Sequence, residues 1–221
     1  MNISIFDVLG PVMIGPSSSH TAGAARLAYV ARQIVDAPFT KVDFYLHGSF
    51  AKTYKGHGTD RALVAGVLGL REDDERLAAS FEMAKEQGIS YTFQTIELEG
   101  AHENTVKMVF HLSKGGESTI IGSSLGGARI IITEVDGFAM EYTATSPAIL
   151  ITQQDSKGIV SSVTAVLAHF NINIGVMKLS RSAKGGIASC MIETDSFIPA
   201  EVNAILCNYP QIYRVRIINC R

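Results

Sequence analysis

The sequence predicts an α+β protein of two domains, a mixed α+β domain over residues 1–145 and a ferredoxin-like βαββαβ domain over 146–221. Three observations lead to this prediction. Alanine-rich stretches with apolar residues at helical spacing precede several β-rich runs in the first part. The last third alternates short β-rich runs with helical ones in the order of one sheet covered by helices on one side. A break of small residues ending in proline, Tyr142–Pro147, separates the two parts.

In the first domain, apolar spacing predicts three helices, over 21–37, 59–70 and 76–87, and Gly88 is expected to end the third. Residues 42–46 are expected to form a strand that leads into His47–Ser49. The β-rich runs 89–98, 104–112, 117–121 and 129–136 predict a sheet of mostly antiparallel strands. The small residues at 122–127 are interpreted as a turn.

In the second domain the elements can be assigned almost one by one. The expected order is a strand at 148–152, a helix at 159–170 ended by Asn171, strands at 172–179 and 187–193 joined by a hairpin turn at 181–186, a helix beginning at Pro199, and a strand at 212–220. Tyr213, Val215 and Ile217 are expected on one face of the last strand.

Composition excludes several classes of protein. Of the 221 residues, 47% are hydrophobic and 18% charged, and the net charge is -2, so the basic surface of a nucleic-acid-binding protein is missing. No run of about 20 apolar residues is present, so no membrane span is predicted. Met1–Asp7 lacks the features of an export signal, and we expect a cytoplasmic protein. The excess of apolar residues suggests a subunit interface.

The three cysteines, Cys190, Cys207 and Cys220, are widely spaced in the last third of the chain. They form no CxxC pair, so neither a zinc site nor an iron–sulfur motif is predicted in this chain. We interpret them as buried thiols.

Two histidines lie within runs of glycine and hydroxyl residues, each just before a predicted helix. The runs are Gly15–Thr21 (GPSSSHT) and Lys55–Arg61 (KGHGTDR). The start of a helix favours an anion, serine hydroxyls add hydrogen-bond donors, and imidazole transfers protons near neutral pH. If the two loops and the 122–127 turn meet, they would form a site for abstracting a proton next to a carboxylate.

In this hypothesis His20 and His57 are the base and the acid, and Asp60 or a carbonyl group orients one imidazole. The candidate ligand-binding residues are Ser17, Ser18, Ser19, Thr21, Lys55, Asp60, Gly126 and Gly127. The alternatives are that the serine run is a helix cap, that Lys55 is an exposed surface lysine, and that Arg61 is an anion partner. A dinucleotide-binding motif and a P-loop do not fit the spacing. His47, His102 and His111 lack a comparable context.

At these residues the chain resembles the iron–sulfur-dependent bacterial L-serine dehydratases, over essentially its whole length. The resemblance is to the β chain of the two-subunit form, through GPSSSHT with Ala22–Gly23, and through Gly48–Ser49 leading to KGHGTDR. It implies that residues 1–145 form the β-chain substrate-binding domain, which also occurs in some phosphoglycerate dehydrogenases, and that residues 146–221 form an ACT domain, a module that senses small molecules.

The resemblance further implies conversion of L-serine to pyruvate and ammonia, with a 4Fe-4S cluster on a separate α chain and no metal ligand in this chain. His57 would be the base, because its glycine neighbours permit close approach, and His20 the second acid–base group or a substrate ligand. The serines and Thr21 would bind the carboxylate.

The ACT-like part would associate with a second copy and could bind an effector at Asp155, Gly158 and Asn173, unless these are plain turn residues. The competing hypothesis is a regulatory subunit that only senses amino acids.

Overall fold

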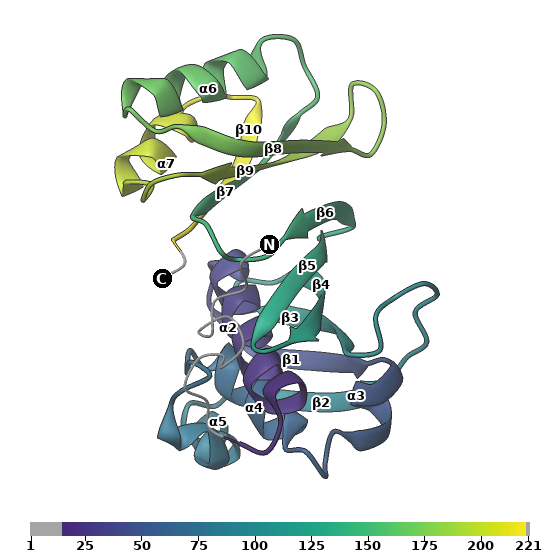
Figure 1. Ribbon diagram of the computed structural model, residues 1–221. Helices are drawn as coiled ribbons and strands as arrows, with labels where there is room; N and C mark the ends of the chain where they lie inside the picture. The colour runs from purple at the N-terminus through teal and green to yellow at the C-terminus, as the bar shows by residue number, and fades with distance from the viewer. Residues whose placement is uncertain (1–14, 220–221) are drawn as a thin grey trace, which may run out of the picture. The chain divides into compact units, whose positions relative to one another are not determined.

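The computed structural model describes residues 15–219, which divide into two compact units (Figure 1). Unit 1 runs to Gly137 and includes Glu141–Thr143, whereas unit 2 comprises Phe138–Met140 and the chain from Ala144 on. Met1–Asp7 and Cys220, both used in the sequence analysis, lie outside the described residues. Within residues 15–219, no helix combines the length and the apolar character needed to cross a bilayer.

A six-stranded sheet with the order β2-β1-β3-β4-β5-β6 forms the framework of unit 1. Its strands are β1 (Phe39–Leu46), β2 (Ser90–Thr95), β3 (Thr105–Leu112), β4 (Glu117–Gly126), β5 (Arg129–Val135) and β6 (Phe138–Tyr142), the last of which contains residues of both units. Strands β1 and β2 are parallel, and β1, β3, β4 and β5 pair antiparallel in that order. The mostly antiparallel sheet that the sequence predicts is confirmed.

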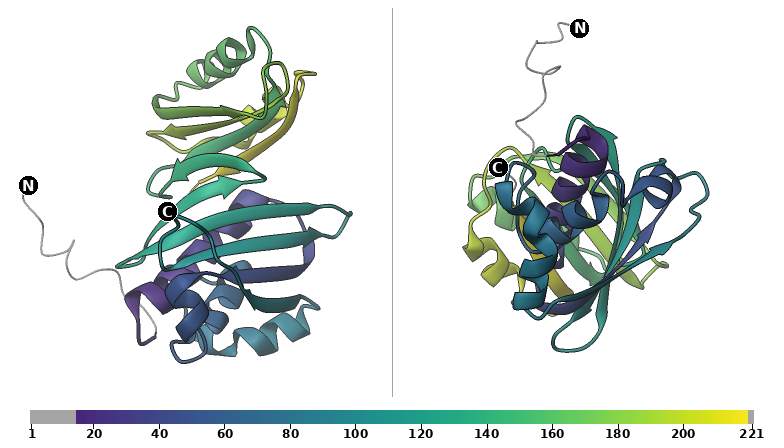
Figure 2. Two further views of the ribbon diagram at one scale, coloured as in Figure 1. Left: turned by 90° about the vertical axis from the view of Figure 1, so that its right-hand side faces the viewer. Right: turned by 90° about the horizontal axis from the view of Figure 1, so that it is seen from below.

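The helices of unit 1 lie along one face of this sheet (Figure 2). They are the π-helical turn η1 (Ser18–Gly23), α2 (Ala24–Val35), α3 (Gly48–Thr53), α4 (Thr59–Val67), the 3₁₀ turn η2 (Glu75–Ala79) and α5 (Ser80–Glu86). Helix α2 packs against β4 and β5, and α4 packs against α2. The alanine-rich faces of α2 and α4 are buried in this contact, which is what their apolar spacing predicts.

The close contact of α2 and α4 depends on Gly66. A Cβ atom there would lie 2.3 Å from the carbonyl oxygen of Ala25 and 2.6 Å from the Cβ of Ala28. Gly66→Ala is therefore expected to lower the free energy of unfolding by about 1–2 kcal/mol, because overpacking against backbone outweighs the gain in helix propensity. Gly56→Ala, whose Cβ would lie 3.7 Å from its nearest neighbour, is the control for denaturant unfolding. Equal stability of both variants would contradict this account of the contact.

One local prediction for unit 1 was wrong, and two of its elements were not predicted. The 122–127 segment is not a turn, because β4 continues to Gly126. Its small residues instead allow α2 to approach the sheet, since a Cβ at Gly122 would lie 2.7 Å from Cδ1 of Leu27. Helix α3 and strand β6 were not predicted from the sequence. The six-residue α3 is too short for a periodic signal.

On the other face of the sheet, Asp43 is surrounded by polar partners. Its carboxylate lies 2.9 Å from Lys41 Nζ and 2.7 Å from His111 Nε2, and it accepts a hydrogen bond from Thr92. Desolvation alone would raise the pKa of Asp43, but the hydrogen bonds from Thr92, Lys41 and His111 together lower it to about 2. The ionised carboxylate is thus more stable in the folded chain than in the unfolded one.

This carboxylate is expected to stabilise the fold at neutral pH. Because its folded pKa lies below its unfolded value, the contribution is present above about pH 4 and is lost as the pH falls toward about 2. Asp43→Asn should therefore lower the free energy of unfolding by roughly 1–2 kcal/mol near pH 7, and the difference from wild type should shrink below about pH 4. Denaturant unfolding at several pH values measures this. A difference that is independent of pH would contradict the electrostatic explanation.

Unit 2 contains a four-stranded sheet with the order β10-β7-β9-β8 and two helices on one of its faces (Figure 1). Its elements are β7 (Ala148–Gln154), α6 (Ile159–His169), β8 (Ile174–Arg181), β9 (Ile187–Thr194), α7 (Ala200–Leu206) and β10 (Ile212–Ile218). The predicted ferredoxin-like βαββαβ arrangement is confirmed. Asn171, with a φ of 56°, follows α6 as expected, and Pro199 caps α7.

One prediction for β10 was wrong. The register against β7 shifts between Ile212 and Arg214, so one extra residue is accommodated there. Val215 is consequently buried in the core of unit 2 with Ile217 packed beside it, whereas Tyr213 is 54% exposed. The bulge explains why Tyr213 does not share their face.

Candidate active site

The structure brings His20 and His57 together. The centroids of their imidazole rings are 4.8 Å apart, with an angle of 45° between the ring planes. Both residues belong to unit 1. Thr21 and His57, which belong to the two loops, are 36 positions apart in the sequence. The two loops therefore meet within a single unit of the chain.

His20 lies in the first turn of the helix formed by η1 and α2. Ser17 caps this helix, and its Oγ accepts a hydrogen bond from the backbone N–H of His20 at 3.1 Å. The imidazole is held by Ser49, whose Oγ lies 2.9 Å from Nε2, and by the ring of Phe50, whose centroid is 5.3 Å away. Burial lowers the pKa of His20, and the neighbouring His57 lowers it further. His20 is thus mainly a neutral imidazole at neutral pH.

His57 lies in the turn that precedes α4. Gly58 caps α4 with a φ of 67°, a conformation that favours glycine. The carbonyl oxygen of His57 accepts a hydrogen bond from Thr21 Oγ1 at 2.9 Å, which joins the two loops. The Nδ1 atom of His57 is buried and has no hydrogen-bond partner among the described residues. A cavity of about 190 Å³ adjoins this histidine and is also lined by Gly15, Pro16, Thr21 and Arg61.

The C-terminal end of β4 and the residues after it hold the serine run, Ser17–Ser19, by hydrogen bonds to its backbone. Ser124 Oγ donates a hydrogen bond to the carbonyl oxygen of Ser19 at 2.9 Å. The N–H of Ala128 donates one to the carbonyl oxygen of Ser18 at 3.4 Å. Gly23 permits this approach, because a Cβ there would lie 2.0 Å from Ser124 Oγ. A Cβ at Gly126 would lie 3.4 Å from Ser19 Oγ. Three segments of the chain therefore meet at one place.

This arrangement is suited to proton transfer. Two adjacent imidazoles, one of which has a buried nitrogen without a hydrogen-bond partner among the described residues, can divide the roles of base and acid. Hydroxyl groups and the first turn of a helix lie beside them, as binding of an anionic group requires.

Comparison with known proteins identifies the family. Residues 4–115 match the family described as serine dehydratase beta chain. The L-serine dehydratase beta chain of Peptoniphilus asaccharolyticus is 44% identical over 193 residues, which cover 87% of each chain. A probable L-serine dehydratase beta chain of Bacillus subtilis (strain 168) is 42% identical over 212 residues, 96% of each chain.

The chain belongs to the serine dehydratase beta chain family.

More distant similarities extend beyond this family. A D-3-phosphoglycerate dehydrogenase of Bacillus subtilis (strain 168) is 27% identical over 89% of this β chain and 37% of its own length. Among solved structures, an ACT domain of GTP pyrophosphokinase from Chlorobium tepidum aligns at a TM-score of 0.27 and 23% identity, covering 33% of this chain and 83% of that one.

Within this serine dehydratase β chain, the serine run has two kinds of hydroxyl group. Those of Ser17 and Thr21 are engaged inside the protein, in the helix cap and in the bridge to His57. Those of Ser18 and Ser19 form no hydrogen bond among the described residues. The helix cap and the candidate anion site thus coexist in one segment.

Three charged residues of the second motif lie less centrally than the sequence suggests. Lys55 is exposed, with Nζ 5.7 Å from the ring centroid of Tyr54. Asp60 accepts a hydrogen bond from the N–H of Arg61 at 2.8 Å and does not orient His57 Nδ1. The guanidinium group of Arg61 donates a hydrogen bond to the carbonyl of Ala78 and lies 4.7 Å from the ring centroid of Phe81. These contacts explain its position without a bound anion. Ser49, which was not among the predicted site residues, instead orients the imidazole of His20.

The candidate effector residues of unit 2 do not form one pocket within a chain. Asp155 accepts hydrogen bonds from Gly185 N at 2.9 Å and Arg181 Nη1 at 3.0 Å, next to the first residue of β9. Asn173 instead bonds to Asp195, beyond the last residue of β9. The eight residues of β9 separate them by about 25 Å. Gly158 has a φ of 87° and caps α6, as a plain turn residue would.

The described residues offer no ligand set for a metal cluster. They contain no group of three or more histidine, cysteine, aspartate or glutamate side chains that could hold a metal ion. Cys190 is buried, with its pKa raised by desolvation to about 11, whereas Cys207 is exposed, so its interpretation as a buried thiol was wrong. Residues 15–219 of this β chain therefore do not fit a 4Fe-4S cluster.

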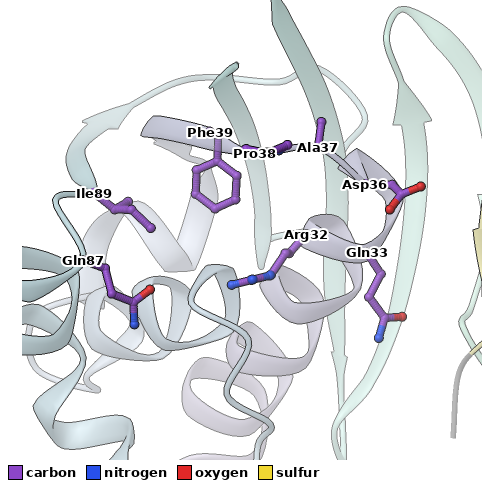
Figure 3. Close-up of a pocket in the computed structure, with 8 residues that line it drawn as sticks. All are labelled: Arg32, Gln33, Asp36, Ala37, Pro38, Phe39, Gln87 and Ile89. Carbon is purple, nitrogen blue, oxygen red and sulfur yellow. The ribbon is translucent and has the colours of Figure 1, made fainter. Parts of the chain in front are cut away.

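A second cavity, of about 490 Å³, lies at the C-terminal end of α2 and shares no lining residue with the His57 cavity (Figure 3). Arg32 and Gln87 point toward each other across it, and Asp36 points away. Arg32 Nη1 already donates to the carbonyl of Val67 at 2.9 Å. The cavity thus lacks the paired acid–base groups found at His20 and His57.

Proposed function

We propose that this chain is the β subunit of an L-serine dehydratase and that, together with an α chain, it converts L-serine to pyruvate and ammonia. The observation that supports this most directly is the pair of imidazoles 4.8 Å apart in a chain of the serine dehydratase beta chain family. Elimination of water from serine needs a base for the α-proton and an acid for the departing hydroxyl group, and two adjacent histidines can supply both.

In the proposed reaction, an imidazole takes the α-proton of serine, and we assign this role to His57 because its Nδ1 has no hydrogen-bond partner within residues 15–219. The electron pair of the C–H bond forms the double bond between Cα and Cβ while the C–O bond breaks. The departing oxygen takes a proton, assigned to His20, and leaves as water. The aminoacrylate then tautomerises to an imine, which consumes one water molecule and releases ammonia and pyruvate.

The substrate carboxylate would bind at the beginning of η1. The hydroxyl groups of Ser18 and Ser19 and the first-turn amides are the donors available there. Hydrogen bonds to the carboxylate also stabilise the negative charge that develops when the α-proton leaves. Gly126 and Gly127 would complete this side of the site, because Gly126 and Ala128, which flank Gly127, lie next to Ser19 and Ser18.

We further propose that a 4Fe-4S cluster belongs to the α chain. The absence of a metal-ligating group within residues 15–219 supports this assignment, since a cluster needs several thiolate or comparable ligands. Self-association through unit 2 is also part of the proposal. It is supported by the edge position of β8 and by the exposure of Val176 and Leu179, which are 53% and 45% exposed. A cytoplasmic location for the complete enzyme completes the proposal.

Anaerobic co-expression with the α chain, followed by a pyruvate assay with L-serine, tests the proposed function. Pyruvate should form only when both chains are present, and the isolated β chain should contain neither iron nor sulfide. An α chain that turns over serine at the full rate without the β chain would contradict a catalytic role. Iron and sulfide bound to the isolated β chain would contradict the assignment of the cluster.

A further inference from the structure

Asn104, the residue just before β3, points to a further role in substrate binding that rests on the proposed function. We infer that Asn104 is a substrate-binding residue whose carboxamide oxygen accepts a hydrogen bond from the α-ammonium group of L-serine. Asn104 belongs to neither of the two histidine motifs, and its assignment depends on where the backbone places it.

The segment before β3 lies between the two contacts that fix the serine run. The carbonyl oxygen of Glu103 accepts hydrogen bonds from Ser49 N at 2.7 Å and Phe50 N at 3.3 Å. The carbonyl oxygen of Asn104 accepts one from Ser124 N at 3.0 Å. Ser49 is the residue that holds His20, and Ser124 is the one that holds Ser19. Asn104 therefore lies between Ser49 and Ser124, the two residues that hold the site.

Strand alternation shows which way the Asn104 side chain points. Thr105 forms a hydrogen bond with the side chain of its partner Ser123, on the face of the sheet away from the helices. The residues of alternate parity, Val106, Met108 and Phe110, are fully buried under the helices. Asn104 has this parity and lies opposite Ser124, whose hydroxyl group reaches η1. Its side chain is thus on the face that carries the histidines.

The Oδ1 atom of Asn104 is buried and has no hydrogen-bond partner among the described residues. An unsatisfied buried acceptor is costly, so the structure favours a ligand that supplies a donor here. The last side-chain torsion of asparagine is soft, and rotation about it can present the oxygen to a small molecule.

Of the polar groups of L-serine, the ammonium group matches this acceptor. The carboxylate offers no donor. The hydroxyl group has a proton, but an acceptor for that proton would increase the negative charge on the oxygen and hinder its departure. The ammonium group carries three donors and no acceptor. A neutral amide also binds it without placing an additional carboxylate next to the imidazoles.

The test uses the α–β complex under anaerobic conditions, with wild type, Asn104→Leu, Asn104→Asp and, as control, Glu103→Gln. Glu103 is the exposed neighbouring residue, whose carboxylate lies close to Gly48 and is a competing partner for the ammonium group. Binding of L-serine is measured by calorimetry in addition to turnover. Two analogues serve as inhibitors: 3-hydroxypropionate, which lacks the amino group, and ethanolamine, which lacks the carboxylate.

Asn104→Leu is expected to weaken binding of L-serine and ethanolamine by about 10-fold or more, since hydrogen bonds to charged groups are worth at least that factor. Binding of 3-hydroxypropionate should change by less than about 2-fold, because it lacks the group that Asn104 contacts. Asn104→Asp, which retains an acceptor, should stay within about 3-fold of wild type, as should Glu103→Gln.

Equal weakening of all three ligands by Asn104→Leu would overturn the inference, because it indicates a structural role. Unchanged binding of all three would overturn it as well, and so would a loss confined to Glu103→Gln. A wild-type complex that binds L-serine without releasing pyruvate refutes the proposed function but leaves the binding comparison valid. The two failures are therefore distinguishable.

Discussion

Replacing His57 with alanine in the α–β complex is expected to lower kcat for L-serine by about 10²–10⁴-fold, the usual contribution of a general base. The reason is geometric. Its Nδ1 is buried and has no hydrogen-bond partner among the described residues, and the residue lies against a cavity. The fold should persist, because the contact from Thr21 is made to the backbone carbonyl of His57 rather than to its side chain. Pyruvate formation is measured at saturating serine.

The matched control is His169→Ala, a histidine at the C-terminal end of α6 that contacts the ring of Phe170. It should retain turnover close to wild type. Size-exclusion chromatography with the α chain shows whether the His57 variant assembles. A His57 variant that assembles and turns over serine at the wild-type rate would refute its role as the base.

Replacing His20 with glutamine should lower kcat by about 10²-fold or more, because the departing hydroxyl group loses its proton donor. Glutamine keeps a polar group near Ser49, so the loss reports proton transfer rather than packing. The pKa of His20 is lowered by burial and by His57, so its imidazole stays mainly neutral until the pH falls below its ordinary value of 6.5. The proton donor is the imidazolium form of His20, so kcat/KM is expected to fall as the pH rises through the pKa of His20, which lies below its ordinary value of 6.5.

Ser49→Ala serves as the comparison for this prediction. It removes the hydroxyl group that lies 2.9 Å from Nε2 of His20 but leaves both imidazoles in place. Turnover should fall much less than in the His20 variant, and the pH at which kcat/KM falls should shift because the environment of His20 has changed. A profile of kcat/KM against pH that is identical in wild type and Ser49→Ala would show that this contact does not tune the reaction.

The fold of unit 2 could be predicted almost completely because each element has a strong local signal. Asn171 and Pro199 mark helix boundaries, and Ile159, Val163 and Leu167 repeat at helical spacing. The bulge at Tyr213 could not be predicted, because it depends on register against β7. In unit 1, the glycines and serines of β4 imitate a turn. These residues are small because α2 and η1 pack closely against them. Such packing depends on the tertiary structure and has no local sequence signal.

For the site, the two histidine motifs were recognisable because unusual residue types are concentrated in short segments. The residues that support them were harder to find. Ser49, Ser124 and Asn104 are common polar residues, and their proximity follows from strand pairing between β3 and β4 and from the short helix α3. Charged residues were the least reliable indicators of the site, since Lys55 and Arg61 make ordinary contacts with neighbouring aromatic rings.

The contact between Ser124 and Ser19 spans 105 positions of the chain. The serine run therefore reaches its final geometry only after the distal end of β4 has been synthesised and paired with β3. A nascent chain that has exposed both histidines to solvent still lacks this support. Maturation of the reactive centre is thus tied to completion of the sheet, and premature termination before Ser124 would leave both motifs present in sequence but without their shared scaffold.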